Sequence, residues 1–371
     1  MENNNSNVLA LKYRPKIFSD LIGQEIIAET ILNSINSGRT PNAYLLTGIR
    51  GVGKTTIARL IAKALNCTQK SDQGPEYNKK NLCDNCKQIE NSNHIDVFEI
   101  DAASKTGIDD VRELIENAKY NPTNAKFKIF IIDEIHMLSK QAFNGLLKTL
   151  EEPPQRLKFI LATTEARKIP VTVLSRCQRF DLRRVDLEKI FKHLKKISEI
   201  EKGKIDDNAL KLLARASEGS VRDAISLLDR ALIFQSLDEN KKIGERDVRE
   251  MLGLADKSKI IYLMSSVFQG NEKEATNQLK DLTKDGLDAK IFLNDFLELL
   301  YLFGRRVNLG PIEKDLFLSQ DELKLIDEIG SNLNMQDLSL FWQLTLKTIE
   351  DLKLVSSEEI ALQMFLMQLM H

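Results

Sequence analysis

The strongest chemical pattern in the sequence is a glycine-rich segment from Gly48 to Thr55. It fits the spacing G-x-x-x-x-G-K-[ST], in which backbone N–H groups turn inward around phosphate oxygens. Lys54 is expected to reach the β- and γ-phosphates of ATP, and Thr55 supplies a hydroxyl for Mg²⁺. The predicted nucleotide-binding residues of this segment are Gly48, Ile49, Arg50, Gly51, Val52, Gly53, Lys54, Thr55 and the following Thr56.

A pair of carboxylates marks a second part of the same predicted site. Asp133 and Glu134 follow the apolar run Ile129–Ile132, which is typical of a buried strand. The carboxyl ends of parallel strands form the ligand-binding edge of a sheet, so the pair is expected near the phosphates. Asp133 suits Mg²⁺, directly or through water, and Glu134 suits polarisation of the attacking water. The structural alternative is an acidic pair that caps a helix.

Further polar residues follow other predicted strands and turns. Thr163 and Thr164 end the apolar run that begins at Phe159, where a hydroxyl fits a γ-phosphate sensor or a strand-end turn equally well. Arg176 lies beyond a strand end, a position from which an arginine can stabilise phosphate charge in a neighbouring molecule. Arg222 opens a helix and fits a group that reports the state of the nucleotide. Taken alone, both arginines fit a solvated surface as well.

Three of the four cysteines form a spaced cluster. Cys83 and Cys86 have the two-residue spacing of a zinc hairpin, and Cys67 supplies a third thiolate. A closed structural zinc site needs a fourth ligand, for which Asp84 and His94 are candidates. The alternative is a set of reduced thiols in a loop.

The elements that position these residues alternate in the first half of the chain. Short buried strands are predicted at Ala43–Thr47, Val97–Asp101, Ile129–Asp133 and Phe159–Thr164, and helices at Thr55–Asn66, Ile108–Ala118 and Lys140–Leu150. Such alternation predicts a parallel sheet flanked by helices.

Beyond about Arg184 only helical patterns remain. Helices are predicted at Leu187–Ile197, Asp207–Ser217 and Val221–Phe234, and the chain from about Met251 is also helical. Apolar stripes at Ala289–Phe303 and Leu362–Leu369 fit either a domain core or a surface that faces partner subunits. Ser356 to Glu359 resembles an N-cap followed by an acidic first turn.

Composition limits the function classes. The 371 residues are enough for two or three domains. Lys plus Arg number 53 and Asp plus Glu 54, so no global basic field attracts nucleic acid. No apolar stretch is long enough for a membrane, and the polar segment Met1–Asn7 lacks the features of a signal peptide. The sequence therefore predicts a cytoplasmic protein without a membrane partner.

Several motifs together resemble one family. They are Tyr13-Arg14-Pro15, Asp20–Gln24, Gly48–Thr55, Cys83–Cys86, Glu99–Ser104, Asp133–Leu138, Leu147–Pro154 and Ser175-Arg176-Cys177. Over nearly its whole length the chain resembles the gamma/tau subunits of the bacterial DNA polymerase III clamp loader, which are AAA+ ATPases. This resemblance implies an α/β P-loop AAA+ domain over 1–184 with a cysteine-containing insertion at about 67–86. A small helical lid domain over 185–248 and an all-α collar domain over 249–371 follow.

The resemblance also implies residue roles and partners. Tyr13 and Arg14 belong to a segment that contacts the adenine and ribose, and Thr164 resembles the first sensor. Arg176 resembles the arginine finger and Arg222 the second sensor. The implied cofactors are ATP, Mg²⁺ and, at the cysteines, Zn²⁺. The implied partners are the other subunits of a hetero-oligomeric ring, a sliding clamp and primer-template DNA.

Two departures from the family pattern stand out. Lys80 occupies the place of the first of three closely spaced cysteines, which places zinc binding in question. The chain ends at His371, just after the collar, which fits either a short loader-only form or a truncated chain.

Two other functions are alternatives to the clamp-loader hypothesis. One is another replication or recombination AAA+ ATPase, such as a helicase loader or a branch-migration protein. The other is a non-catalytic scaffold subunit of the loader. The intact Lys54, Thr55, Asp133 and Glu134 argue against the scaffold.

Overall fold

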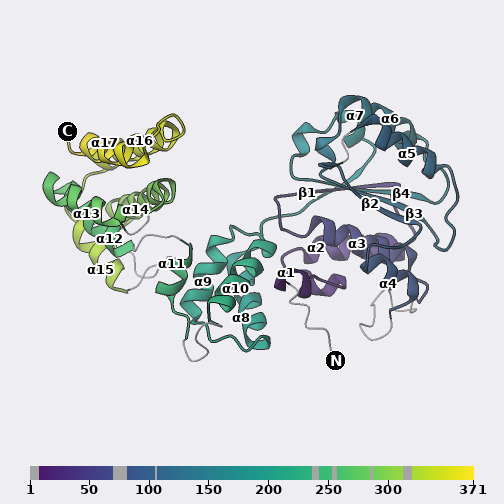
Figure 1. Ribbon diagram of the computed structural model, residues 1–371, viewed down its shortest axis with the longest axis horizontal. Helices are drawn as coiled ribbons and strands as arrows, with labels where there is room; N and C mark the ends of the chain where they lie inside the picture. The colour runs from purple at the N-terminus through teal and green to yellow at the C-terminus, as the bar shows by residue number, and fades with distance from the viewer. Residues whose placement is uncertain are drawn as a thin grey trace. The chain divides into compact units, whose positions relative to one another are not determined.

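The computed structural model describes residues 8–69, 82–104, 107–235, 242–252, 257–284, 287–311 and 320–371 (Figure 1). The polar segment Met1–Asn7 and Lys80 lie outside the described residues. The chain divides into two compact units, residues 1–203 with 213–234 and residues 204–212 with 235–371.

The first unit is built on a five-stranded sheet in the order β2-β3-β4-β1-β5. Its strands are β1 (Ala43–Thr47), β2 (Val97–Asp101), β3 (Lys128–Asp133), β4 (Leu157–Thr163) and β5 (Gln178–Asp181). Every pair is parallel. The predicted parallel sheet is therefore confirmed, and its carboxyl ends meet at one edge, where Thr47 pairs with Thr163 and Asp101 with Asp133.

Both faces of this sheet are buried, which explains the continuous apolar runs of its central strands. Along β1, Tyr44 and Leu46 join a core with Ile57 of the following helix, whereas Leu45 joins the opposite core with Phe143. Figure 1 shows α2 and α3 on one face and α5, α6 and α7 on the other.

The helices of the N-terminal part are short. They are α1 (Leu9–Lys12), η1 (Phe18–Asp20), α2 (Glu25–Asn36), α3 (Lys54–Asn66), α4 (Asp84–Glu90), α5 (Ile108–Ala118), η2 (Ile135–Met137), α6 (Lys140–Glu151), η3 (Ala166–Lys168) and α7 (Val171–Leu174). The next three are α8 (Leu187–Ile200), α9 (Asp207–Ala216) and α10 (Val221–Gln235). The predicted helices are confirmed, and none of their ends is shifted by more than three residues.

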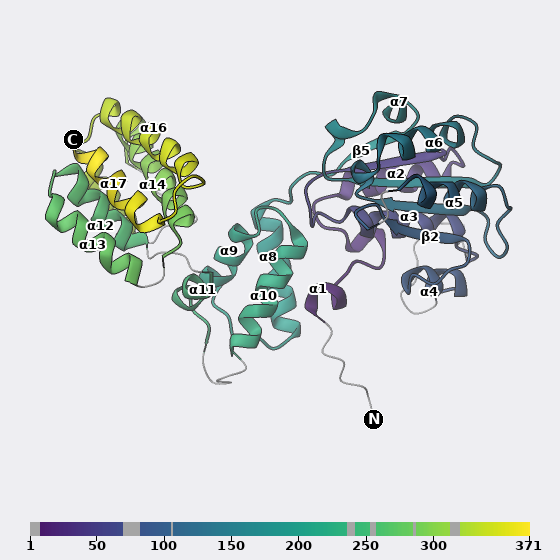
Figure 2. The ribbon, with the colours of Figure 1, turned by 45° about the horizontal axis from the view of Figure 1, so that its top comes forward.

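The second unit is helical. It contains α11 (Glu245–Leu252), α12 (Lys257–Phe268), α13 (Glu272–Lys284), α14 (Ala289–Leu309), α15 (Gln320–Gly330), α16 (Met335–Asp351) and α17 (Glu358–Met370). Helices α12 to α17 form a packed helical body (Figure 2). The stripe from Ala289 to Phe303 is buried in its core, and Phe296 meets Phe365 of α17 edge-to-face at 5.3 Å. The core interpretation of both stripes is thus confirmed. The predicted N-cap of α17 is also confirmed, because the Ser357 side chain accepts a hydrogen bond from the Ile360 N–H.

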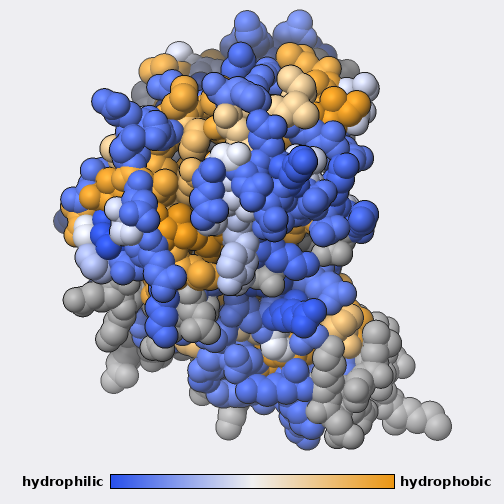
Figure 3. All heavy atoms as spheres, turned by 90° about the vertical axis from the view of Figure 1, so that its left-hand side faces the viewer, coloured by the Kyte–Doolittle hydropathy of each residue, from blue (hydrophilic) through white to orange (hydrophobic). Residues whose placement is uncertain are grey.

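Some apolar side chains of this unit remain exposed. Leu340, Trp342 and Leu346 lie on α16, and Ile360, Met364 and Met367 lie on α17. In Figure 3, hydrophobic residues (orange) are visible in patches among the hydrophilic residues (blue) on one side of the molecule. Among the described residues, no helix is both long and apolar enough to cross a bilayer.

Candidate nucleotide-binding site

The glycine-rich segment is the turn from β1 into α3. Gly48, Gly51 and Gly53 have φ angles of +145°, +80° and +105°, which other residues rarely adopt. A Cβ at Gly51 would lie 1.9 Å from Ser220 Oγ, and the Gly51 carbonyl accepts a hydrogen bond from the Arg222 N–H at 3.2 Å. The beginning of α10 therefore packs directly against the loop, and only glycine leaves room for it.

Lys54 is the buried cation of the loop. Its side chain is 6% exposed, and Nζ donates to the carbonyl oxygens of Gly48 and Ile49, each at 3.0 Å. Burial lowers the pKa of Lys54, while the nearby Glu134 and Asp133 oppose that shift. The ammonium is thus held inside the curve of the loop, next to the two carboxylates that balance its charge.

Thr55 and Asp133, the two residues predicted to bind Mg²⁺, contact each other. Thr55 Oγ1 donates to Asp133 Oδ2 at 2.5 Å, which joins the first turn of α3 to the end of β3. The other carboxylate oxygen of Asp133 accepts the Glu134 N–H at 3.0 Å. A hydroxyl and a carboxylate in contact are oxygen ligands that suit Mg²⁺.

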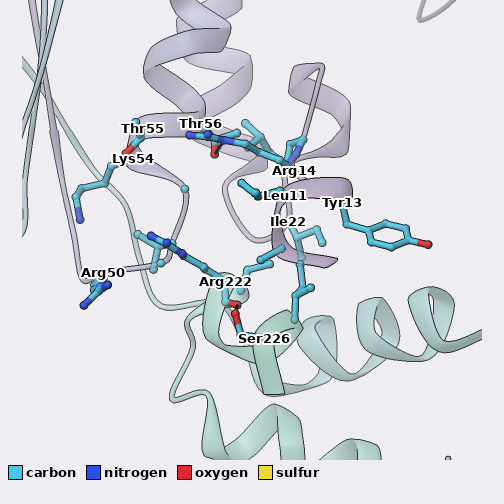
Figure 4. A pocket seen from close by; sticks show the side chains of 18 of the residues that line it. Leu11, Tyr13, Arg14, Ile22, Arg50, Lys54, Thr55, Thr56, Arg222 and Ser226 are labelled. Atoms are coloured by element: carbon cyan, nitrogen blue, oxygen red, sulfur yellow. Dashed lines mark hydrogen bonds between the residues drawn. The ribbon is translucent and has the colours of Figure 1, made fainter. Parts of the chain in front are cut away.

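A cavity of about 700 Å³ joins these groups. Of the predicted residues it is lined by Tyr13, Arg14, Arg50, Gly51, Val52, Gly53, Lys54, Thr55, Thr56, Asp133, Glu134 and Arg222. Figure 4 shows Arg222 approaching from α10, opposite Thr55 and Thr56 at the start of α3. Gly48, Ile49, Thr164 and Arg176 are not among its lining residues. The size matches an ordinary small-molecule site.

The segment before α2 contacts both the cavity and the end of α8. Arg14 Nε donates to Thr56 Oγ1 at 3.1 Å, whereas the Tyr13 hydroxyl donates to Glu201 at the end of α8. Lys12 also pairs with Glu201, at 2.7 Å. Burial, followed by the hydrogen bond to Glu201, raises the pKa of Tyr13 to about 12. Sequence reasoning did not single out Glu201, because no local pattern marks a long-range partner.

Glu134 is held by the end of the neighbouring strand. Its Oε2 accepts hydrogen bonds from the Thr164 N–H at 3.0 Å and the Thr164 hydroxyl at 2.9 Å. Thr163 Oγ1 lies 3.0 Å from His136 Nδ1. Both hydroxyls at the strand end thus belong to the surroundings of Glu134, although neither lines the cavity.

Three family models cover most of the chain. They are described as DNA polymerase III, delta subunit (residues 23–186), DNA polymerase III clamp loader subunit, ATPase lid domain (189–236), and DNA polymerase III subunits gamma and tau domain III (243–371). DNA polymerase III subunit gamma of Buchnera aphidicola subsp. Baizongia pistaciae is 38% identical over 366 residues, which cover 98% of this chain and 97% of that protein. The chain belongs to the DNA polymerase III gamma/tau family.

Some relatives in the family are longer than this chain. DNA polymerase III subunit tau of Escherichia coli is 38% identical over 97% of this chain, but the match spans only 55% of the tau protein. Among solved structures, the RuvB Holliday junction branch migration motor of Thermotoga maritima is 21% identical, with a TM-score of 0.49. That match covers 69% of this chain and 79% of the RuvB chain.

Arg176 of this gamma/tau family member lies on the surface after α7. Its guanidinium donates to the Thr172 carbonyl at 2.5 Å and forms an ion pair with Glu151, the last residue of α6. It is absent from the cavity lining, so the structure does not bring it to the phosphate loop of its own chain.

The three cysteines converge on one point. Cys67 ends α3, Cys83 caps α4, and the sulfur atoms of Cys67, Cys83 and Cys86 all lie within 4.8 Å of one another. Burial raises the pKa values of Cys67 and Cys86. Burial also acts to raise that of Cys83, but hydrogen bonds from Thr68 and Cys86 outweigh it and lower the pKa to about 6.

The structure does not place either proposed fourth ligand in this group. Within the described residues, the group of ligand atoms contains the three thiols and neither Asp84 nor His94. The Asp84 side chain is 90% exposed and pairs with Lys87, whereas His94 is buried and accepts the Asp96 N–H through Nδ1. The two candidates were wrong because proximity in sequence does not decide where a side chain points.

Proposed function

We propose that this chain is the ATP-hydrolysing motor subunit of a bacterial replicative clamp loader. In this role it opens a sliding clamp and places it on primer-template DNA within the DNA polymerase III holoenzyme, in the cytoplasm. The observation that carries the proposal is that Lys54, the Thr55–Asp133 pair and Glu134 meet at one cavity in a gamma/tau family member. A non-catalytic scaffold would not need all four groups.

Each group has a defined task in hydrolysis. The loop N–H groups and Lys54 bind the phosphates, and Thr55 and Asp133 hold Mg²⁺, which neutralises phosphate charge. Glu134 polarises the attacking water. Thr164, which already bonds to Glu134, acts as the first sensor, and Arg222 acts as the second sensor from α10.

The same proposal assigns three domains to the chain. They are the AAA+ domain over 1–184, the lid over 185–248 and the collar over 249–371, in line with the ranges of the three family models. The exposed apolar residues of α16 and α17 support a collar surface that contacts other loader subunits.

ATP hydrolysis by the loader ring that contains this chain tests the function. We expect ATP turnover to rise when a sliding clamp is added, and to rise further with primed DNA. Unprimed duplex DNA is the control. Stimulation by a DNA junction without any effect of the clamp would instead indicate a branch-migration or helicase-loading ATPase.

Zinc binding at the cysteine cluster is a separate proposal. The three converging thiols supply three of the four ligands of a structural zinc site. We expect about one zinc per chain in metal-replete protein by elemental analysis, and loss of that zinc in Cys86→Ser. Cys177→Ser is the matched control, since Cys177 lies outside the group. Well under one zinc per unchanged chain would show that the thiols remain free.

A further inference from the structure

His136 lies between two carboxylates beside the cavity. It belongs to η2, directly after the Asp133–Glu134 pair, and its side chain is 6% exposed. Nδ1 lies 3.4 Å from Glu134 Oε2, and Nε2 lies 3.4 Å from Glu165 Oε1. His136 does not line the cavity, so it can act on a bound nucleotide only through another residue.

The hydrogen bonds around His136 connect the ends of β3 and β4. Thr163 Oγ1 accepts the Glu165 N–H at 3.0 Å and lies 3.0 Å from His136 Nδ1. The adjacent Thr164 holds Glu134 Oε2 through its N–H and its hydroxyl. Glu134 Oε2 therefore lies between Thr164, which directly follows β4, and the Nδ1 edge of His136.

Glu134 needs such support because of its backbone. Its φ angle is +45°, in the left-handed region that costs free energy for a residue with a side chain. The carboxylate reaches across to Thr164 at the end of the neighbouring strand β4. A displacement of a reacting group by about 1 Å can reduce a rate about 100-fold, so neighbours that fix the carboxylate affect turnover directly.

We propose that His136 is a positioning residue for Glu134. The ring is held by the hydrogen bond between Nδ1 and Thr163 Oγ1, and its Nδ1 edge lies 3.4 Å from Glu134 Oε2, where it limits the positions that the carboxylate can take. Glu165 lies at the opposite edge of the ring, 3.4 Å from Nε2. This inference rests on the proposed role of Glu134 in polarising the attacking water. Because His136 lies outside the cavity, its loss should lower kcat and leave ATP affinity unchanged.

The test compares two isosteres in the assembled loader. We expect His136→Ala to lower kcat about 10- to 100-fold, with a Kd for ATP within about twofold of the unchanged chain. His136→Asn places an amide where Nδ1 lies and should recover most of the loss. His136→Gln places it where Nε2 lies and should recover less. His94→Asn is the matched control, a buried histidine outside the cavity whose replacement should leave kcat unchanged.

A double variant separates positioning from folding. In a Glu134→Gln chain, His136→Asn and His136→Ala should cause no further loss of turnover. The carboxylate that His136 positions is already absent from that chain. A further loss there, or equal falls in kcat and ATP affinity in His136→Ala, would overturn the positioning role. If Glu134→Gln itself keeps normal turnover, the proposed function of Glu134 fails instead.

Discussion

Replacement of Glu134 by glutamine is expected to abolish ATP turnover while ATP binding remains close to that of the unchanged chain. Glutamine keeps the shape of the side chain but cannot attract a proton from water. Removal of a positioned general base typically lowers a rate about 10²- to 10⁴-fold. Steady-state hydrolysis and equilibrium binding of a fluorescent ATP analogue measure the two quantities separately.

The Lys54→Ala variant is the matched comparison for Glu134→Gln. Lys54 is buried in the loop and supplies charge to the phosphates both before and during reaction. Its loss should therefore weaken nucleotide binding and turnover together, whereas Glu134→Gln should separate them. Turnover at the unchanged rate in Glu134→Gln would remove Glu134 from its assigned role.

The central sheet was predictable because burial on both faces leaves a plain signal. The central strands β1, β3 and β4 are such apolar runs, whereas β2 (Val97–Asp101) carries Glu99 and Asp101 and has no buried residue. All four predicted strands appear in the structure within two residues of their expected ends. The edge strand β5, of whose four residues only Phe180 is buried, was not predicted. Helix α2 was also not predicted, although Ala28, Ile31 and Ile35 lie on one buried face. The sequence of a short amphipathic segment indicates its secondary structure less clearly than the sequence of a fully buried strand does.

The chemistry of the site was predictable only where one local segment contains it. The loop from Gly48 to Thr55 and the Asp133–Glu134 pair are local patterns, and the structure brings them to one cavity. Contacts between segments that are distant in sequence produce no local sequence pattern. The bond from Tyr13 to Glu201 spans 188 residues, and the approach of Thr164 to Glu134 depends on the pairing of β3 with β4. Such partners become visible only after the chain has folded.

Arg176→Ala is expected to reduce hydrolysis strongly without weakening ATP binding by the same chain. Arg176 is exposed, is absent from the cavity of its own chain, and is held by Glu151 and the Thr172 carbonyl. An exposed ion pair contributes only about 0–1 kcal/mol, so the guanidinium can leave Glu151 for a phosphate at little cost. Arginine fingers that act on a neighbouring subunit contribute about 10³- to 10⁵-fold in rate.

A mixing experiment decides whether Arg176 acts on a neighbour. Arg176→Ala has an intact phosphate loop, and Lys54→Ala has an intact arginine. Rings that contain both chains should recover turnover, because the second chain presents its arginine to the ATP of the first. Arg179→Ala is the control, since Arg179 is another exposed arginine, paired with Asp181 at 2.6 Å, and its loss should leave turnover unchanged. If mixed rings assemble, Arg176→Ala binds ATP and turnover still does not recover, Arg176 does not act between subunits. Its contact with Glu151 would then be a feature of the surface of its own chain. Recovery would instead link hydrolysis to the docking of subunits, so that ATP is consumed only in an assembled ring.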